Sequence, residues 1–318
     1  MKSSDSILSS PFGGSTGEAG VGGSSGARRS HVPGAASSPE LSGEGGSRDA
    51  FARRLEIEGL LDLPRRAFAL SPQEAALMGR SLSLGRVKNI SLSPDGAVRG
   101  TAADVEATAL LAGLLERYAR WAAGLIGELA PRYLAALERG RTSFRPRAVE
   151  DAPASPRKDD RRLHVDAFAS QPTGGRRILR VFSNINPQGE ARVWRVGEPF
   201  EDHARRWVGQ ARRPLPGETW ALQRLGITKA RRTPYDAMML ALHDAAKLDE
   251  TYQRAAPRRE IAFPAGASWT VFTDSVVHAA ISGRHALEQT FYLPISAMAA
   301  PEASPLRVLE RIAGRRLT

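Results

Sequence analysis

The residues with the clearest chemical potential are His164 and Asp166, which stand two positions apart. Residues i and i+2 of a β-strand share one face, so both side chains could reach one metal ion. A third ligand would come from a distant segment, and His278 stands 114 residues further on, between two segments of β-type composition. Two histidines and one carboxylate form the facial triad that holds Fe(II) in non-haem oxygenases and leaves coordination positions open.

The chain contains no cysteine, and this narrows the possible metal chemistry. Disulfides, thiolate zinc sites and iron–sulfur clusters are excluded, so any metal must sit on imidazole and carboxylate. A bare His-x-Asp also arises by chance, and its alternative interpretation is a surface histidine that caps a turn. The neighbouring β-type segments and the second histidine favour the metal site. We interpret His203 and His243 as structural or surface residues.

Oxygenases with this triad commonly use 2-oxoglutarate, whose distal carboxylate needs a cationic and preferably bidentate partner. Many place an Arg or Lys in the strand after the distal histidine. That strand here offers Thr290 but no base, and Arg284 stands only six residues after His278. Arg180 is a further candidate, because strand alternation places Arg180 and Asn184 on one face. It either binds the dicarboxylate from an inner face or lies on the solvent face.

Residues 141–147 (RTSFRPR) form a second candidate anion site, which includes Arg145 and Arg147. The segment stands where the helical region is expected to meet the strands. A solvated basic linker is the alternative interpretation.

The elements that must position these residues fall into three regions. Residues 1–50 hold 11 glycines and 13 serines, and we expect this lead to be disordered and to lack the apolar core of a signal peptide. Residues 51–140 are expected to be mainly helical, with helices over 51–62 and 104–139. Asp104 is the expected N-cap of the second helix, Pro131 is expected to break or kink it, and Gly140 is its expected end.

Residues 141–318 change to short β-type segments rich in Val, Ile, Phe, Trp and Thr. Helices are expected near 200–207 and 235–248. A helical region followed by many short strands indicates a barrel or sandwich packed on helices. The expected strands cover residues 163–168, 178–185, 191–196, 260–263, 268–272 and 287–293.

The chain is strongly basic, with 45 Lys+Arg against 34 Asp+Glu over 318 residues. Without the lead, the remaining residues carry a net charge of +12. Such a charge indicates an anionic partner but does not identify it. A nucleic-acid-binding protein is one interpretation, although the chain shows no helix-turn-helix or RNP-type signature. A zinc hydrolase is another, although no glutamate is spaced as in H-E-x-x-H.

Four longer segments closely resemble the Kdo hydroxylases (Kdo is 3-deoxy-D-manno-oct-2-ulosonic acid). Two of them surround the His-x-Asp pair and Arg180, and the likeness extends over roughly residues 55–318. They are more specific than His-x-Asp alone. The segments are 158–168 (KDDRRLHVDAF), 175–187 (GRRILRVFSNINP), 142–146 (TSFRP) and 287–294 (LEQTFYLP).

This resemblance implies an α+β fold, with a double-stranded β-helix (jelly-roll or cupin-like) core and an N-terminal helical region packed against it. It implies a dioxygenase that uses Fe(II), 2-oxoglutarate and O2 to hydroxylate C3 of a Kdo sugar on Kdo–lipid A. The alternative is a 2-oxoglutarate oxygenase that acts on another substrate. We expect a cytoplasmic enzyme that contacts the anionic inner membrane transiently, and no nucleic-acid partner.

By the motif match, His164, Asp166 and His278 are the expected iron ligands and catalytic residues. The likeness also supports Arg180 and Arg145 as anion-binding groups, without deciding which holds 2-oxoglutarate and which the sugar carboxylate. Arg284 and Thr290 complete the expected cofactor-binding set. Arg147 and Asn184 are the expected substrate-binding residues.

Overall fold

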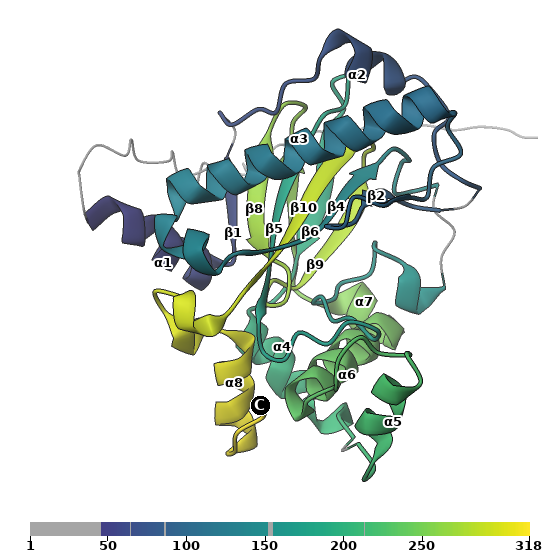
Figure 1. The fold of residues 1–318 in the computed structure, drawn as a ribbon. Helices are drawn as coiled ribbons and strands as arrows, with labels where there is room; N and C mark the ends of the chain where they lie inside the picture. Colours follow the sequence, from purple (N-terminus) through teal and green to yellow (C-terminus); the bar gives the residue numbers. More distant parts are fainter. Residues whose placement is uncertain (1–45, 64, 86, 152–154, 213) are drawn as a thin grey trace, which may run out of the picture. The chain divides into compact units, whose positions relative to one another are not determined.

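The computed structural model describes residues 46–318 except 64, 86, 152–154 and 213. Most of the lead predicted to be disordered, residues 1–45, therefore lies outside the described residues. Residues 46–50 open the first helix, α1 (Gly46–Glu58). The described part is built from two antiparallel sheets with helices packed against them (Figure 1).

The larger sheet has the strand order β1-β8-β5-β10-β4-β2-β3, and the smaller has the order β7-β6-β9. Their inner faces meet through aromatic side chains. The ring centroids of Phe182 in β5 and Trp194 in β6 lie 5.0 Å apart. This is the expected α+β fold with a double-stranded β-helix core. The strands are β1 (Leu60–Leu63), β2 (Ile90–Leu92), β3 (Val98–Arg99), β4 (Glu138–Arg145), β5 (Arg177–Asn184), β6 (Arg192–Val196), β7 (Arg259–Phe263), β8 (Ser268–Phe272), β9 (His278–Ser282) and β10 (Ala286–Leu293).

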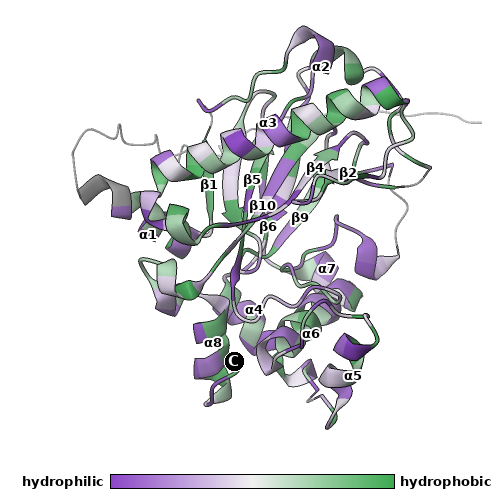
Figure 2. Cartoon of the chain, viewed as in Figure 1, coloured by the Kyte–Doolittle hydropathy of each residue, from purple (hydrophilic) through white to green (hydrophobic). Residues whose placement is uncertain are grey.

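The long helix α3 (Val105–Leu129) covers the outer face of the larger sheet (Figure 1). Apolar and polar residues alternate along it at helical spacing, as Figure 2 shows. Asp104 caps its first turn as predicted, with Oδ1 accepting a hydrogen bond from the Ala107 amide at 2.7 Å. Tyr118 is fully buried and donates its hydroxyl to the Val181 carbonyl of β5. This helix therefore supports the strand that carries Arg180.

The predicted helix over 104–139 is too long. It ends at Leu129, a 3-10 turn follows (Pro131–Ala136), and β4 begins at Glu138. Gly140 lies inside β4 instead of ending the helix. A Cβ there would lie 2.9 Å from the Thr290 carbonyl oxygen, so the close pairing of β4 with β10 requires glycine. Strand pairing outweighs the helical propensity of residues 135–139.

Other elements also differ from the predictions, and the strands β2 and β3 lie in the region expected to be mainly helical. Gly59, at φ +76°, ends α1, and the residues predicted as the rest of that helix form β1, which pairs with β8. The predicted strand over 163–168 is reduced to an isolated bridge at His164. The strand β9 was not predicted, because its Ala-rich sequence has little β propensity.

Of the remaining helices, α2 packs against α3, whereas α4–α8 gather at the opposite end of the sheets (Figure 1), and those near 200–207 and 235–248 were predicted. Of these, α6 begins with a capping box in which Thr233 and Asp236 exchange hydrogen bonds with each other's backbone amide. The helices are α2 (Pro72–Leu77), α4 (Phe200–Trp207), α5 (Glu218–Arg224), α6 (Pro234–Leu248), α7 (Glu250–Ala255) and α8 (Pro305–Ala313).

A polar cluster ties α4 to α7. Glu198 accepts hydrogen bonds from the Tyr252 hydroxyl at 3.1 Å and from Arg206 at 3.0 Å, and its carboxylate lies 3.5 Å from His203. His203 is fully buried, in keeping with a structural role. The hydrogen bond with His203, together with those from Arg206 and Tyr252, lowers the pKa of Glu198 from 4.5 to about 2.

We expect Glu198→Gln to lower stability at neutral pH but not in acid. Because its pKa is lower in the folded protein, ionised Glu198 stabilises the fold above pH 4.5, and this contribution is lost as the pH falls towards about 2. The difference in urea midpoint between wild type and variant should shrink below pH 4.5. Glu106→Gln, an exposed residue of α3, is the control. A difference that stayed constant with pH would contradict the assignment.

Candidate metal centre

The two histidines of the predicted triad are brought together by a backbone bridge. The amide of His164 donates to the carbonyl of His278 at 3.0 Å, and the His278 amide returns a bond to the His164 carbonyl at 2.8 Å. Residues paired in this way point their side chains to the same side. The two imidazole rings consequently lie with their centroids 4.6 Å apart.

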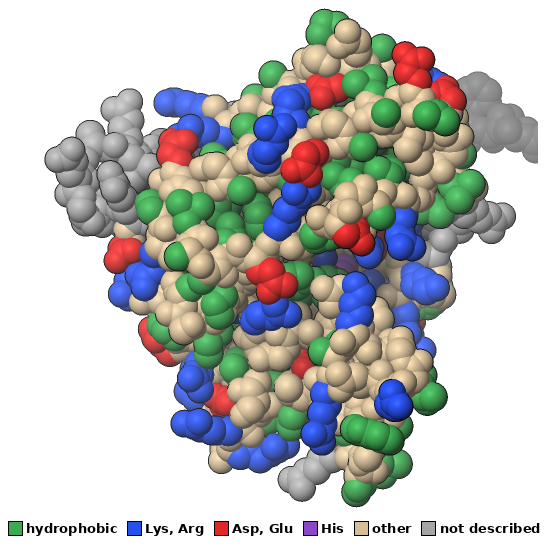
Figure 3. All heavy atoms as spheres, viewed as in Figure 1, with side chains coloured by type: hydrophobic (Ala, Val, Ile, Leu, Met, Phe, Trp, Pro, Cys, Tyr) green, Lys and Arg blue, Asp and Glu red, His purple; other side chains and the backbone are tan. Residues whose placement is uncertain are grey.

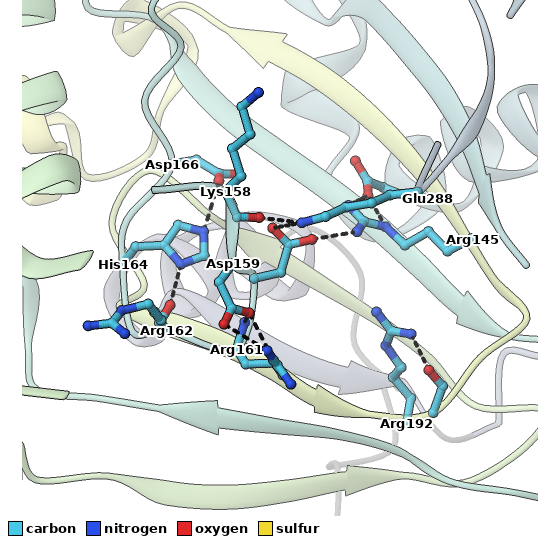
Figure 4. A network of polar contacts seen from close by, with 12 residues as sticks. Arg145, Lys158, Asp159, Arg161, Arg162, His164, Asp166, Arg192 and Glu288 are labelled. Carbon is cyan, nitrogen blue, oxygen red and sulfur yellow. Dashed lines mark hydrogen bonds and ion pairs between the residues drawn. The ribbon is translucent and has the colours of Figure 1, made fainter. Parts of the chain in front are cut away.

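Backbone carbonyls orient both imidazoles. Nδ1 of His164 lies 2.7 Å from the Arg162 carbonyl oxygen, and Nδ1 of His278 lies 2.9 Å from the Val276 carbonyl oxygen. A carbonyl only accepts hydrogen bonds, so each Nδ1 carries the proton and each Nε2 keeps its lone pair. This arrangement is typical of metal-binding histidines, whose other nitrogen donates to a fixed acceptor. Figure 4 shows His164 held between Asp166 and the Arg162 carbonyl.

Asp166 completes the group. Its amide donates to the Thr273 carbonyl at 2.8 Å, which fixes the backbone, and its Oδ1 lies 3.7 Å from Nε2 of His164. One donor atom from each of the three residues lies within 4.8 Å of the others, and all three side chains are buried. The structure thus gathers the predicted triad at one point between the sheets.

Burial and charge set the protonation of the three groups. Burial lowers the pKa of His164 to about 3 and also lowers that of His278, so both imidazoles are neutral at pH 7. Burial opposes ionisation of Asp166, but the adjacent Arg180 guanidinium outweighs it and holds the pKa well below 3.8. Neutral imidazole and ionised carboxylate are the forms that bind metal.

Arg180 is buried, so the solvent-face interpretation of this residue is wrong. Its Nη2 lies 2.8 Å from Oδ2 of Asp166, and its Nη1 donates to Oε1 of Glu288 at 2.7 Å. Arg145 approaches the same glutamate from β4, with Nε donating to Oε2 at 2.9 Å. The two arginines therefore flank one carboxylate beside the triad, and the linker interpretation of Arg145 is wrong.

The other predicted binding residues lie in different surroundings. Thr290 donates its hydroxyl to Glu288 at 3.2 Å and so adjoins the arginine pair. Arg147 donates to the Gly85 carbonyl and lines a small cavity with Arg145. Arg284 instead lies in the turn before β10, with Nε 3.7 Å from Glu190. Asn184 uses its side-chain amide to hold the Glu190 and Phe263 carbonyls.

Sequence reasoning missed several groups at the site. Glu288 shares a strand face with Thr290, and a buried carboxylate needs cations, so alternation over 286–293 could have identified it. Asp160, which stands four residues before His164, pairs with Arg145 at 3.5 Å. Trp194 stacks on the His278 imidazole, with centroids 5.1 Å apart. No local sequence signal indicates that contact.

The donor set fits Fe(II) with a dicarboxylate. Two nitrogens and one oxygen match the facial triad. Arg180 and Arg145 are paired with Asp166, Glu288 and Asp160. A divalent metal would add two positive charges to this buried site, and a dianion such as 2-oxoglutarate would bring two negative charges beside them.

Comparison with known proteins agrees with this geometry. A family model described as 3-deoxy-D-manno-oct-2-ulosonic acid (Kdo) hydroxylase matches residues 42–316. The chain belongs to the Kdo hydroxylase family. A search of the curated proteins found no match.

Solved structures of a Kdo hydroxylase, KdoO, share the fold of this family member. The complex of KdoO with alphaketoglutarate and Fe(III) superimposes with a TM-score of 0.81 at 44% identity, and covers 86% of this chain and 92% of that one. A complex with cobalt(II) matches with the same TM-score and coverage at 45% identity. KdoO is described as a non-heme Fe(II) alphaketoglutarate dependent dioxygenase.

Proposed function

We propose that this chain is an Fe(II)- and 2-oxoglutarate-dependent dioxygenase that hydroxylates C3 of a Kdo sugar on Kdo–lipid A. The observation that carries the proposal is the buried His164–Asp166–His278 triad beside two arginines, in a member of the Kdo hydroxylase family. Iron with 2-oxoglutarate would supply the oxidising power to insert one atom of O2 into a C–H bond, with release of succinate and CO2.

The chain's own residues would bind and orient the reactants. His164, Asp166 and His278 would hold the metal, with their geometry fixed by the backbone bridge and the carbonyl acceptors. Arg180 and Arg145 would bind carboxylates, one on 2-oxoglutarate and the other on the sugar. Because Glu288 contacts both, it would keep the two guanidiniums in place before either ligand binds.

Arg147, Thr290, Arg284 and Asn184 remain proposed binding residues, and the contacts described above favour the first two. Arg147 and Thr290 adjoin the arginine pair, whereas the interactions of Arg284 and Asn184 are with the turn around Glu190.

The charge of the substrate also supports the proposal. Kdo carries a carboxylate and lipid A carries phosphates, and the basic residues of the chain suit both. None of the described helices has the length and apolar character needed to span the bilayer. We propose a cytoplasmic enzyme that works on its lipid-borne substrate at the inner membrane.

The decisive experiment incubates the full chain with Fe(II), 2-oxoglutarate, O2 and Kdo–lipid A. Mass spectrometry should show the substrate heavier by one oxygen atom, with one succinate formed for each product, and ¹⁸O2 should label the new hydroxyl. Omission of 2-oxoglutarate is the control. Succinate formation without hydroxylated Kdo–lipid A would instead support an oxygenase of another substrate. The absence of both succinate and hydroxylated substrate would overturn the proposal.

A further inference from the structure

The segment of residues 214–232, here named the α5 segment, exposes large apolar side chains to solvent. The exposed fractions are 69% for Leu215, 60% for Trp220, 73% for Leu225 and 54% for Ile227. None of the side chains of α5 is buried. Single exposed apolar residues are ordinary, but four within 13 residues, including a tryptophan, mark an interaction surface.

Cations surround these apolar residues. The α5 segment contains Arg224, Lys229, Arg231 and Arg232 against one acidic residue, Glu218. Glu218 is paired with Arg212, and among the described residues no ion pair involves Arg224, Lys229 or Arg231. The positive charges of the segment are therefore available to an external anion.

The segment is attached firmly where it rejoins the core. The Lys229 amide donates to the Ser170 carbonyl at 2.9 Å, and Arg232 donates to the Ala169 carbonyl at 2.8 Å. Thr228 is buried. The exposed part is thus presented by a fixed base rather than by a free loop.

We propose that the α5 segment docks on the surface of an anionic lipid bilayer, with Trp220, Leu225, Leu215 and Ile227 inserted at the headgroup level. Tryptophan and leucine flanked by basic residues are the composition of interfacial membrane contacts. Each cation near an anionic surface strengthens binding roughly fivefold. A second copy of the chain fits less well, because a symmetric contact would bring like charges together.

Docking through this segment would serve the catalytic site, an argument that rests on the proposed function. Figure 3 shows a histidine side chain within a hollow framed by Lys and Arg, and hydrophobic side chains over α5 on the same face below it. An enzyme held at the bilayer by the α5 segment would present this hollow towards sugars that project from the lipid.

Vesicle binding tests the proposal without any need for activity. The full chain should sediment with phosphatidylcholine vesicles that contain about 30 mol% phosphatidylglycerol, and not with pure phosphatidylcholine. Binding should weaken as salt rises. The double variant Trp220→Ser/Leu225→Ser should bind at least about tenfold more weakly, as should Arg224→Glu/Lys229→Glu. Leu134→Ser, a 53% exposed leucine outside the segment, is the matched control and should bind as wild type.

Tryptophan fluorescence reports the contact directly. Trp220 is 60% exposed, so its emission should shift to shorter wavelength on binding, and Trp220→Phe should bind but lose the shift. Equal binding to neutral and anionic vesicles, or unchanged binding by both double variants, would overturn the proposal. A different result would assign the surface to a second copy of the chain. In that case the wild type would not bind vesicles but would self-associate in analytical ultracentrifugation, and Trp220→Ser/Leu225→Ser would remove this self-association. Unaltered turnover of detergent-dispersed substrate by these variants would separate docking from catalysis.

Discussion

Replacing His164 or Asp166 by alanine is expected to abolish Fe(II)-dependent succinate formation. Removal of groups that only orient metal ligands already lowers metal affinity or activity by about 10- to 100-fold. Loss of a ligand itself should therefore lower them by more than about 100-fold. The effect should appear in kcat and also in metal affinity. Cobalt(II) binding, followed by its visible absorption, gives the second readout.

His285→Asn is the matched control for this prediction. His285 lies beyond the far end of β9 from His278 and adopts φ 56°, a backbone conformation that asparagine tolerates. This variant should keep cobalt binding and turnover within about twofold of wild type. The assignment of the triad would be wrong if either alanine variant retained normal turnover and the same cobalt spectrum.

Replacing Arg180 by methionine is expected to raise the KM for 2-oxoglutarate by about 10- to 100-fold, the value of a hydrogen bond between charged groups. A fall in kcat should accompany it, because Asp166 would lose the cation that lies 2.8 Å from its Oδ2. Arg180→Lys keeps the charge but not the planar fork, so it should recover only part of the affinity. Steady-state kinetics with 2-oxoglutarate varied measure both effects.

Arg161→Ala controls for the general loss of a positive charge near the site, since Arg161 is paired with Asp159 on the surface. Arg145→Met separates the roles of the two arginines. If it raises the KM for Kdo–lipid A while Arg180→Met raises that for 2-oxoglutarate, Arg180 is the cosubstrate anchor. An unchanged KM for 2-oxoglutarate in Arg180→Met, with folding intact by circular dichroism, would reverse that assignment.

The parts of the site that the sequence predicted are those with a local pattern. Asp104 caps α3, β8 spans the predicted residues 268–272, and Arg180 lies on the buried face of β5, one of the two placements that alternation left open. The triad could be predicted because the chain has only six histidines and because segments of β-type composition flank both the His-x-Asp pair and His278.

What the sequence did not predict depends on contacts between distant segments. The bridge between His164 and His278 joins segments 114 residues apart, and neither composition nor periodicity indicates it. The two arginine partners of Glu288 could be identified only from the structure, because β10 lies between β4 and β5. Gly140 was interpreted as a helix end because the demand for a small residue comes from β10, outside its own segment.

The reciprocal backbone bonds between His164 and His278 also link metal retention to the dynamics of the fold. These two amide protons can exchange with solvent only when the bridge opens, and the same opening would separate the two imidazoles. Slow amide exchange at these positions and slow release of bound metal should thus share one local unfolding event. The fold would retain its metal through the kinetics of this opening as well as through the affinity of the ligands.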